Sequence, residues 1–316
     1  MTIWGAVALS LVLGASFGCA ADDGGGVQTP DKLRDDIPDP APGGVQLVSP
    51  PFTIPAGKEV FMCMRIPFEV KDDMYVQSSN IYQMTNGHHT LLFYSENSTG
   101  VDPAPHQCDG FDMTDVRIVT TGTADGMGIA TPPGVVLKVP KGVEIWAQSH
   151  YINATDQDAV AQDVVNLELV PFDQVTDIAS TFAQVDLTFS LPPQQETTRT
   201  MECHPPTEMT IPWLLPHMHE WGTHFKVEFI HDGDTEPFWA WNGDWYDGFR
   251  NDAPLQNFPD NMVVGPTDTI RTTCTWFNDK DQAILFPQEM CATFFPFTPG
   301  DGSLIACDES GSSFEP

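Results

Sequence analysis

The sequence predicts an all-β protein built from β-sandwiches. Short segments rich in β-branched and aromatic residues recur after residue 45, separated by clusters of Pro, Gly, Asn and Asp. Long stretches with the 3.6-residue period of an amphipathic helix are absent. The 28 prolines among 316 residues also oppose helices. The clearest candidate strands are residues 135–139, 144–151, 164–170, 183–189 and 225–230.

The chain is long enough for two domains, since ordinary domains contain roughly 100–150 residues. A boundary is expected within residues 171–177, after one candidate strand and before the next. This divides the folded part into an N-terminal domain of residues 46–173 and a C-terminal domain of residues 174–310. The division gives two β domains of similar size, and a sandwich architecture is expected for them.

The N-terminal segment predicts export. Residues 3–18 are almost wholly apolar but too few to span a bilayer, which needs roughly 20 residues. Residues 1–19 therefore resemble a signal peptide, and the small residue before Cys19 resembles a bacterial lipoprotein cleavage site, which predicts lipidation of Cys19. Residues 20–45, rich in Asp, Gly and Pro, predict a disordered tether. We expect a periplasmic or extracellular lipoprotein of the outer membrane or cell surface, attached only through its lipid.

Charge and cysteine content narrow the functional classes. A formal net charge of −31 excludes nucleic acid as a partner, because the phosphate backbone would repel the chain. Six cysteines remain if Cys19 carries lipid, which allows up to three disulfides and leaves 15 pairings open. The six are Cys63, Cys108, Cys203, Cys274, Cys291 and Cys307. No C-x-x-C motif is present, which disfavours a zinc ribbon or a thioredoxin-type site.

Histidine patterns indicate metal binding. His217 and His219 are two residues apart, so on a strand their imidazoles point to the same face and can chelate one ion. His88 and His89 are adjacent and can share an ion only where the strand is irregular, which Gly87 permits. Imidazole suits copper, zinc, iron and nickel.

Met290 is a further candidate ligand, because a thioether is a soft donor that selects copper. Taken together, the motifs H-H, Q-x-H-Y, H-x-H-x-x-G and E-M-C occur in one order along residues 60–307. This order and spacing resemble the copper type II, ascorbate-dependent monooxygenases, the family of peptidylglycine α-hydroxylating monooxygenase and dopamine β-hydroxylase. That resemblance implies two antiparallel, jelly-roll-like β-sandwich domains facing each other across an open cleft.

The resemblance also implies two coppers per chain. One copper would be bound by His88, His89 and His150 and would store and deliver an electron, with Gln148 assigned to electron transfer. The catalytic copper would be bound by His217, His219 and Met290 and would meet dioxygen and a substrate C–H bond. Ascorbate or another one-electron reductant would supply the electrons. The implied disulfides are Cys274–Cys291 and Cys203–Cys307, which leaves Cys63–Cys108 by parity.

The substrate is expected to differ from that of the peptide-amidating relatives. They carry an Arg two residues before the first His of H-x-H, where this chain has Leu215, and the carboxylate clamp is therefore absent. Leu215 and Phe294 instead indicate an apolar or aromatic small molecule, as does a run of aromatic residues. The run comprises Trp239, Trp241, Trp245, Tyr246 and Phe249, for which ordinary sandwich core is the alternative interpretation.

Two other functions compete with a monooxygenase that hydroxylates a C–H bond. A non-catalytic cell-surface protein for copper binding or storage would keep the same ligands without needing a substrate pocket. A structural or adhesive β-sandwich would carry these histidines by coincidence and bind no stoichiometric copper.

Overall fold

The computed structural model describes residues 30–95, 102–108, 116–123, 126–186, 188–250, 253–286, 288–308, 310–311 and 313–314. Within these ranges the regular elements are β-strands and two short 3-10 helices, so the all-β prediction is confirmed. In the same ranges, no helix has the length and hydrophobicity needed to cross a bilayer. The predicted signal peptide (1–19), the lipidation of Cys19 and residues 20–29 of the predicted tether lie outside the described residues.

The first half of the chain forms a six-stranded sheet, a five-stranded sheet and a two-stranded ribbon. The strand order is β1-β12-β4-β9-β13 in the first sheet, where β8 also pairs with β4, and β6-β3-β10-β5-β7 in the second; β2 pairs with β11. The strands are β1 (Val45–Val48), β2 (Phe52–Ile54), β3 (Lys58–Arg65), β4 (Met74–Tyr82), β5 (Gly87–Tyr94), β6 (His106–Gln107), β7 (Arg117–Thr123), β8 (Gly126–Ala130), β9 (Val135–Val139), β10 (Ile145–Asn153), β11 (Ala159–Ala161), β12 (Val164–Leu169) and β13 (Asp177–Ile178), with the 3-10 helix η2 (Phe172–Gln174) before β13.

The second half forms a six-stranded sheet, a four-stranded sheet and another ribbon. The orders are β20-β17-β23-β14-β24-β25 and β16-β21-β18-β19, and β15 pairs with β22. The strands are β14 (Ser180–Val185), β15 (Ser190–Leu191), β16 (Gln195–Cys203), β17 (Met209–His217), β18 (Gly222–Ile230), β19 (Trp239–Asp244), β20 (Gln256–Val264), β21 (Thr269–Asn278), β22 (Ile284–Leu285), β23 (Ala292–Phe297), β24 (Leu304–Cys307) and β25 (Ser313–Phe314), with η3 (Asp247–Arg250) after β19.

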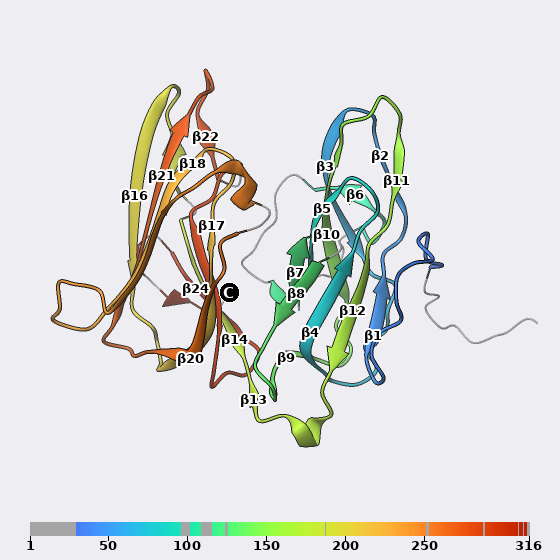
Figure 1. The fold of residues 1–316 in the computed structure, drawn as a ribbon, viewed down its shortest axis with the longest axis horizontal. Coiled ribbons are helices and arrows are strands. Elements are labelled where there is room, and N and C mark those ends of the chain that lie inside the picture. The colour runs from blue at the N-terminus through green and yellow to red at the C-terminus, as the bar shows by residue number, and fades with distance from the viewer. Residues whose placement is uncertain are drawn as a thin grey trace, which may run out of the picture.

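Each half has its own sheets and its own core. Among the described strands, none pairs with a strand of the other half. One buried cluster draws its side chains from residues 47–179 and another from residues 182–307. β13 still pairs with β9 of the first half, whereas β14, which begins at Ser180, pairs with β23 of the second half. The chain therefore passes from one half to the other a few residues after the predicted boundary between 173 and 174. Figure 1 shows the two halves side by side, with β1–β12 in one and β16–β24 in the other.

Three disulfides are present: two confirm the pairings that the family resemblance implied, and the third confirms the pairing left by parity. They are Cys63–Cys108, Cys203–Cys307 and Cys274–Cys291. In the second half, the bond between Cys203 at the end of β16 and Cys307 at the end of β24 joins the four-stranded sheet to the six-stranded sheet. Disulfides persist in oxidising compartments, so the three bonds indicate an extracytoplasmic protein.

The tether prediction needs correction for its described part, residues 30–45. The backbone N–H of Leu33 donates to the side chain of Gln162 at 2.8 Å, and Arg34 donates to the carbonyl of Gln83. Ile37 is 5% exposed and packs with Val48 in a small hydrophobic cluster. These residues lie against the first half because Ile37 packs in an apolar cluster and Leu33 and Arg34 donate hydrogen bonds to that half. The Asp- and Pro-rich composition of the segment did not indicate these contacts.

Replacing both Cys203 and Cys307 by Ser should lower the free energy of unfolding by about 2–5 kcal/mol, because the bond closes a long loop in the unfolded chain. The two cysteines are 104 positions apart. Urea unfolding followed by tryptophan fluorescence measures the change. An unchanged midpoint would show that the bond contributes nothing to the stability of the second half.

Candidate metal centres

The first cluster depends on an irregularity in β5. His89 lies opposite His150 of β10, but the next pair in the register is Gly87 with Tyr151, so His88 is an extra, bulged residue. A bulge changes the direction of its side chain, and this allows two adjacent histidines to approach the same point. Gly87 is required here because a Cβ at this position would lie 2.4 Å from the Cβ of Gln83.

His88, His89 and His150 lie close enough to share one ion. One ring nitrogen from each can be chosen so that all three lie within 4.8 Å of one another. The Nδ1 atoms of His89 and His150 are 3.4 Å apart. Two nitrogens that are each about 2.0–2.1 Å from one tetrahedral ion lie about 3.4 Å from each other. The geometry of this pair therefore fits a bound metal without rearrangement.

Neighbours on β3 fix the ring of His150. Its Nε2 lies 2.8 Å from the carboxylate of Glu59, and Phe61 stacks on its face with ring centroids 4.1 Å apart. A carboxylate that accepts from the second ring nitrogen of a metal-ligating histidine sets its tautomer and orientation. Here this contact would leave Nδ1 of His150 to face His89.

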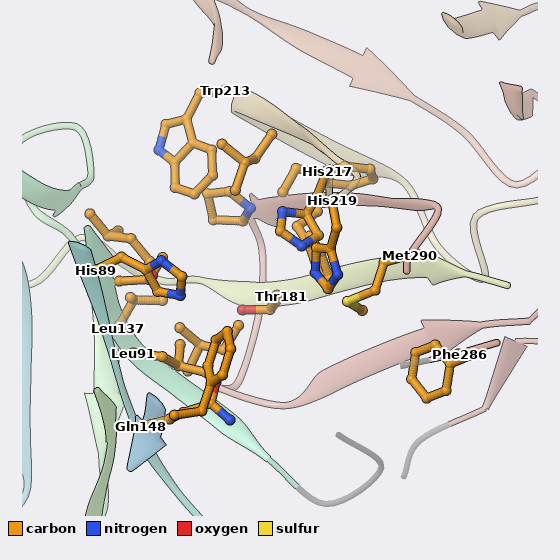
Figure 2. Close-up of a pocket in the computed structure, with 18 of the residues that line it drawn as sticks. His89, Leu91, Leu137, Gln148, Thr181, Trp213, His217, His219, Phe286 and Met290 are labelled. Carbon is orange, nitrogen blue, oxygen red and sulfur yellow. The ribbon is translucent and has the colours of Figure 1, made fainter. Parts of the chain in front are cut away.

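The second cluster lies at the end of β17. His217 is the last residue of the strand and pairs with Ala292 of β23, and His219 follows two residues later. Their ring centroids are 5.0 Å apart. Nδ1 of His219 lies 2.9 Å from the carbonyl oxygen of Gln288, which acts as the acceptor and leaves Nε2 to bind a metal. Figure 2 shows the thioether of Met290 directed toward these two rings.

Glu289 connects the two chain segments that carry this second cluster. Its side chain is fully buried. One oxygen accepts from the backbone N–H groups of His219 at 2.5 Å and Met290 at 3.0 Å. The other oxygen accepts from the backbone N–H of Trp221 at 3.0 Å. Burial raises the pKa of Glu289 to about 7. The backbone N–H groups favour the ionised carboxylate and lower the pKa, but burial has the larger effect. A single carboxylate therefore fixes the backbone of a histidine and a methionine from different segments.

Both clusters open onto one cavity of about 510 Å³ between the two halves. His89 reaches it from the first half, and His217, His219 and Met290 reach it from the second. Among the residues that the structure describes, none of those lining it is Asp, Glu, Lys or Arg. The cavity surface is mainly apolar, and its lining includes Leu91, Ile118, Ile129, Leu137, Trp213, Leu215, Phe286, Phe294 and Pro296. Figure 2 shows His89 and Gln148 on one side of this space and His217, His219 and Met290 on the other.

Some of the residues predicted to contact the substrate line the cavity, and others do not. Leu215 and Phe294 form a cross-strand pair in the cavity wall, and Gln148 also lines the cavity. The aromatic run proposed as a substrate surface is not part of the lining. Most of this run packs on the core of the second half instead; the packed members are Trp239, Trp241, Trp245 and Phe249.

Four residues of the two centres escaped the sequence analysis: Glu59, Phe61, Trp213 and Glu289. Glu59 and Phe61 reach His150 through strand register, which no local motif encodes. Trp213 lies on the same face of β17 as Leu215 and His217, and its indole N–H donates to the carbonyl of Ala130 in the first half at 3.1 Å. Only Glu289 had a local signal, its position next to Met290.

Glu289→Ala should lower the free energy of unfolding by about 3 kcal/mol or more, since it leaves buried N–H groups without an acceptor and opens a cavity. Glu208→Ala is the matched control, because that carboxylate is exposed just before β17 and should change stability by less than about 0.5 kcal/mol. Equal effects of the two substitutions in urea unfolding would refute the role assigned to Glu289.

Comparison with known proteins identifies no relative. No protein-family model and no curated protein matches the chain. Among solved structures, the VP2 subviral particle of infectious bursal disease virus is 9% identical, with 81% of this chain and 72% of that chain covered and a TM-score of 0.21. PNGF-II is 7% identical over 80% of this chain and 64% of that chain, with a TM-score of 0.30. Scores this low carry no argument about function, which must come from the site itself.

Proposed function

We propose that this protein is a copper-dependent monooxygenase that hydroxylates a C–H bond of a small, uncharged, apolar or aromatic substrate. The observation that carries the proposal is the pair of different ligand clusters opening onto one apolar cavity. The family resemblance of the sequence motifs supports the same activity.

The donor sets fit copper at both positions. His88, His89 and His150 offer three imidazoles, and His217 and His219 offer two beside the thioether of Met290. Thioether and imidazole together favour reduced copper over magnesium, calcium or zinc. Bound copper would store an electron at the first cluster and activate dioxygen at the second. The reaction would insert one oxygen atom into the substrate and release the other as water, using two protons and two electrons from ascorbate or a similar reductant.

The protein's own contribution is to position the substrate and exclude water. Leu215 and Phe294 lie beside His217 in the cavity wall and would hold an apolar group next to the second cluster. The polar side chains of the wall, Gln148, Thr121 and Thr181, could hydrogen-bond to a neutral substrate. Against the described residues of this wall, a carboxylate or ammonium group would lose its hydration without meeting an opposite charge, which is costly. Charged substrates are therefore disfavoured.

The finer architecture belongs to the same proposal. Two β-sandwich domains facing across a cleft, with lipid attached at Cys19, would place the cavity outside the cytoplasm. Separate sheets and cores in each half support the two-domain arrangement. The three disulfides support export.

Copper storage is the competing function, and the cavity argues against it. A storage protein needs ligands but no apolar space between them. Here a cavity of about 510 Å³ separates the clusters, within the size range of small-molecule sites, which is roughly 300–1,000 Å³.

Met290→Ile should abolish turnover while leaving copper at the three-histidine cluster, because isoleucine keeps the side-chain volume but removes the soft ligand. Met262→Ile is the matched control: Met262 is also partly buried in the second half but lies outside the cavity lining. The measurement is oxygen uptake coupled to product formation, with ascorbate and a panel of neutral aromatic and aliphatic compounds.

We expect the wild-type protein and Met262→Ile to turn over at similar rates. Wild-type turnover by Met290→Ile would remove the catalytic role of this methionine. A copper-loaded wild-type protein that consumes no oxygen with any compound of the panel would favour storage.

A further inference from the structure

A buried carboxylate lies on the opposite side of the sheet from the first cluster. Asp163 is 2% exposed and immediately precedes β12 of the six-stranded sheet. Its backbone is anchored there: its N–H donates to the hydroxyl of Ser49, and its carbonyl accepts from the N–H of Ser49, both at 2.9 Å. Its side chain reaches the five-stranded sheet that carries His88, His89 and His150.

Each oxygen of Asp163 accepts from two donors of that sheet or its connecting turn. One oxygen accepts from the hydroxyls of Thr90, at 2.5 Å, and Ser149. The other accepts from the hydroxyl of Tyr151 at 2.6 Å and the amide of Gln83 at 3.2 Å. Burial raises the pKa of Asp163, and these four donors act in the opposite direction.

The donors are sequence neighbours of the metal-binding histidines. Thr90 follows His89, and Ser149 precedes His150. Thr90 and Ser149 lie opposite each other across the two strands, next to the pair formed by His89 and His150. Successive residues of a strand point to opposite faces. Asp163 therefore binds the back of the same two strands whose front face carries the ligands.

The network also reaches the turn before the bulge. Gln83 donates to the carbonyl oxygen of His89 at 3.3 Å, and the hydroxyl of Tyr151 accepts from the N–H of Met84 at 3.2 Å. Gln83 is the residue whose side chain excludes a Cβ at position 87. The position of the bulged His88 thus depends on groups that Asp163 holds.

We propose that Asp163 is the positioning residue of the first metal site, which fixes the register and the bulge that bring His88, His89 and His150 together. This rests on the proposed function, because it assumes that those histidines bind copper. It concerns a residue that touches neither metal nor substrate.

Asp163→Asn tests the proposal. An amide supplies one acceptor oxygen in either orientation, so one pair of donors loses its acceptor while the volume is unchanged. We expect the Cu(I) affinity of the three-histidine site to fall by about tenfold or more, as measured by competition with a chromophoric chelator, while the His217–His219–Met290 site keeps its affinity. The Cu(II) electron paramagnetic resonance signal of the first site should broaden or shift.

Leu167→Ala separates positioning from stability. This residue is fully buried in β12 and in the same core, and its side chain makes no hydrogen bond. We expect it to lower the melting temperature while keeping the affinity and spectrum of the first site. A wild-type protein that binds no copper at the three histidines would refute the proposed function. Wild-type affinity and spectrum in Asp163→Asn, beside a wild-type protein that binds copper, would overturn the role of Asp163 alone.

Discussion

A metal cluster whose ligands come from different strands depends on the register between those strands. Here the pairing of β5 with β10 sets His89 opposite His150, and one extra residue brings in His88. A slip of one residue would turn each side chain to the opposite face of its sheet. The same constraint governs the second half, where pairing of His217 with Ala292 places Met290 beside the H-x-H pair.

Each centre has a buried carboxylate close behind it, and the two act on different parts of the chain. Asp163 accepts from side chains that flank His89 and His150, whereas Glu289 accepts from the backbone N–H groups of His219 and Met290. Buried acceptors that satisfy several donors make a site rigid, because moving any one donor leaves a desolvated polar group. The protein's own hydrogen bonds therefore arrange both clusters.

The sequence predicted the parts of the structure that local chemistry encodes. Strand composition predicted the all-β fold, and Gly87 before two adjacent histidines indicated that the strand can be irregular there. Family resemblance implied two of the disulfide pairings, and parity then left Cys63–Cys108 as the third. Asp163, Glu59 and Trp213 could not be predicted, since their partners are distant in sequence and meet only through strand pairing and sheet packing. The aromatic run was left open between sandwich core and substrate surface, because a strand in the core and a strand at a cavity have the same composition; the structure places most of it on the core.

We propose that two copper ions bind in different ligand sets that open onto one cavity. Anomalous scattering from crystals of copper-loaded protein, recorded on both sides of the copper absorption edge, locates each ion directly. We expect two peaks, one among His88, His89 and His150 and the other among His217, His219 and Met290. A single peak, or peaks away from these side chains, would contradict it.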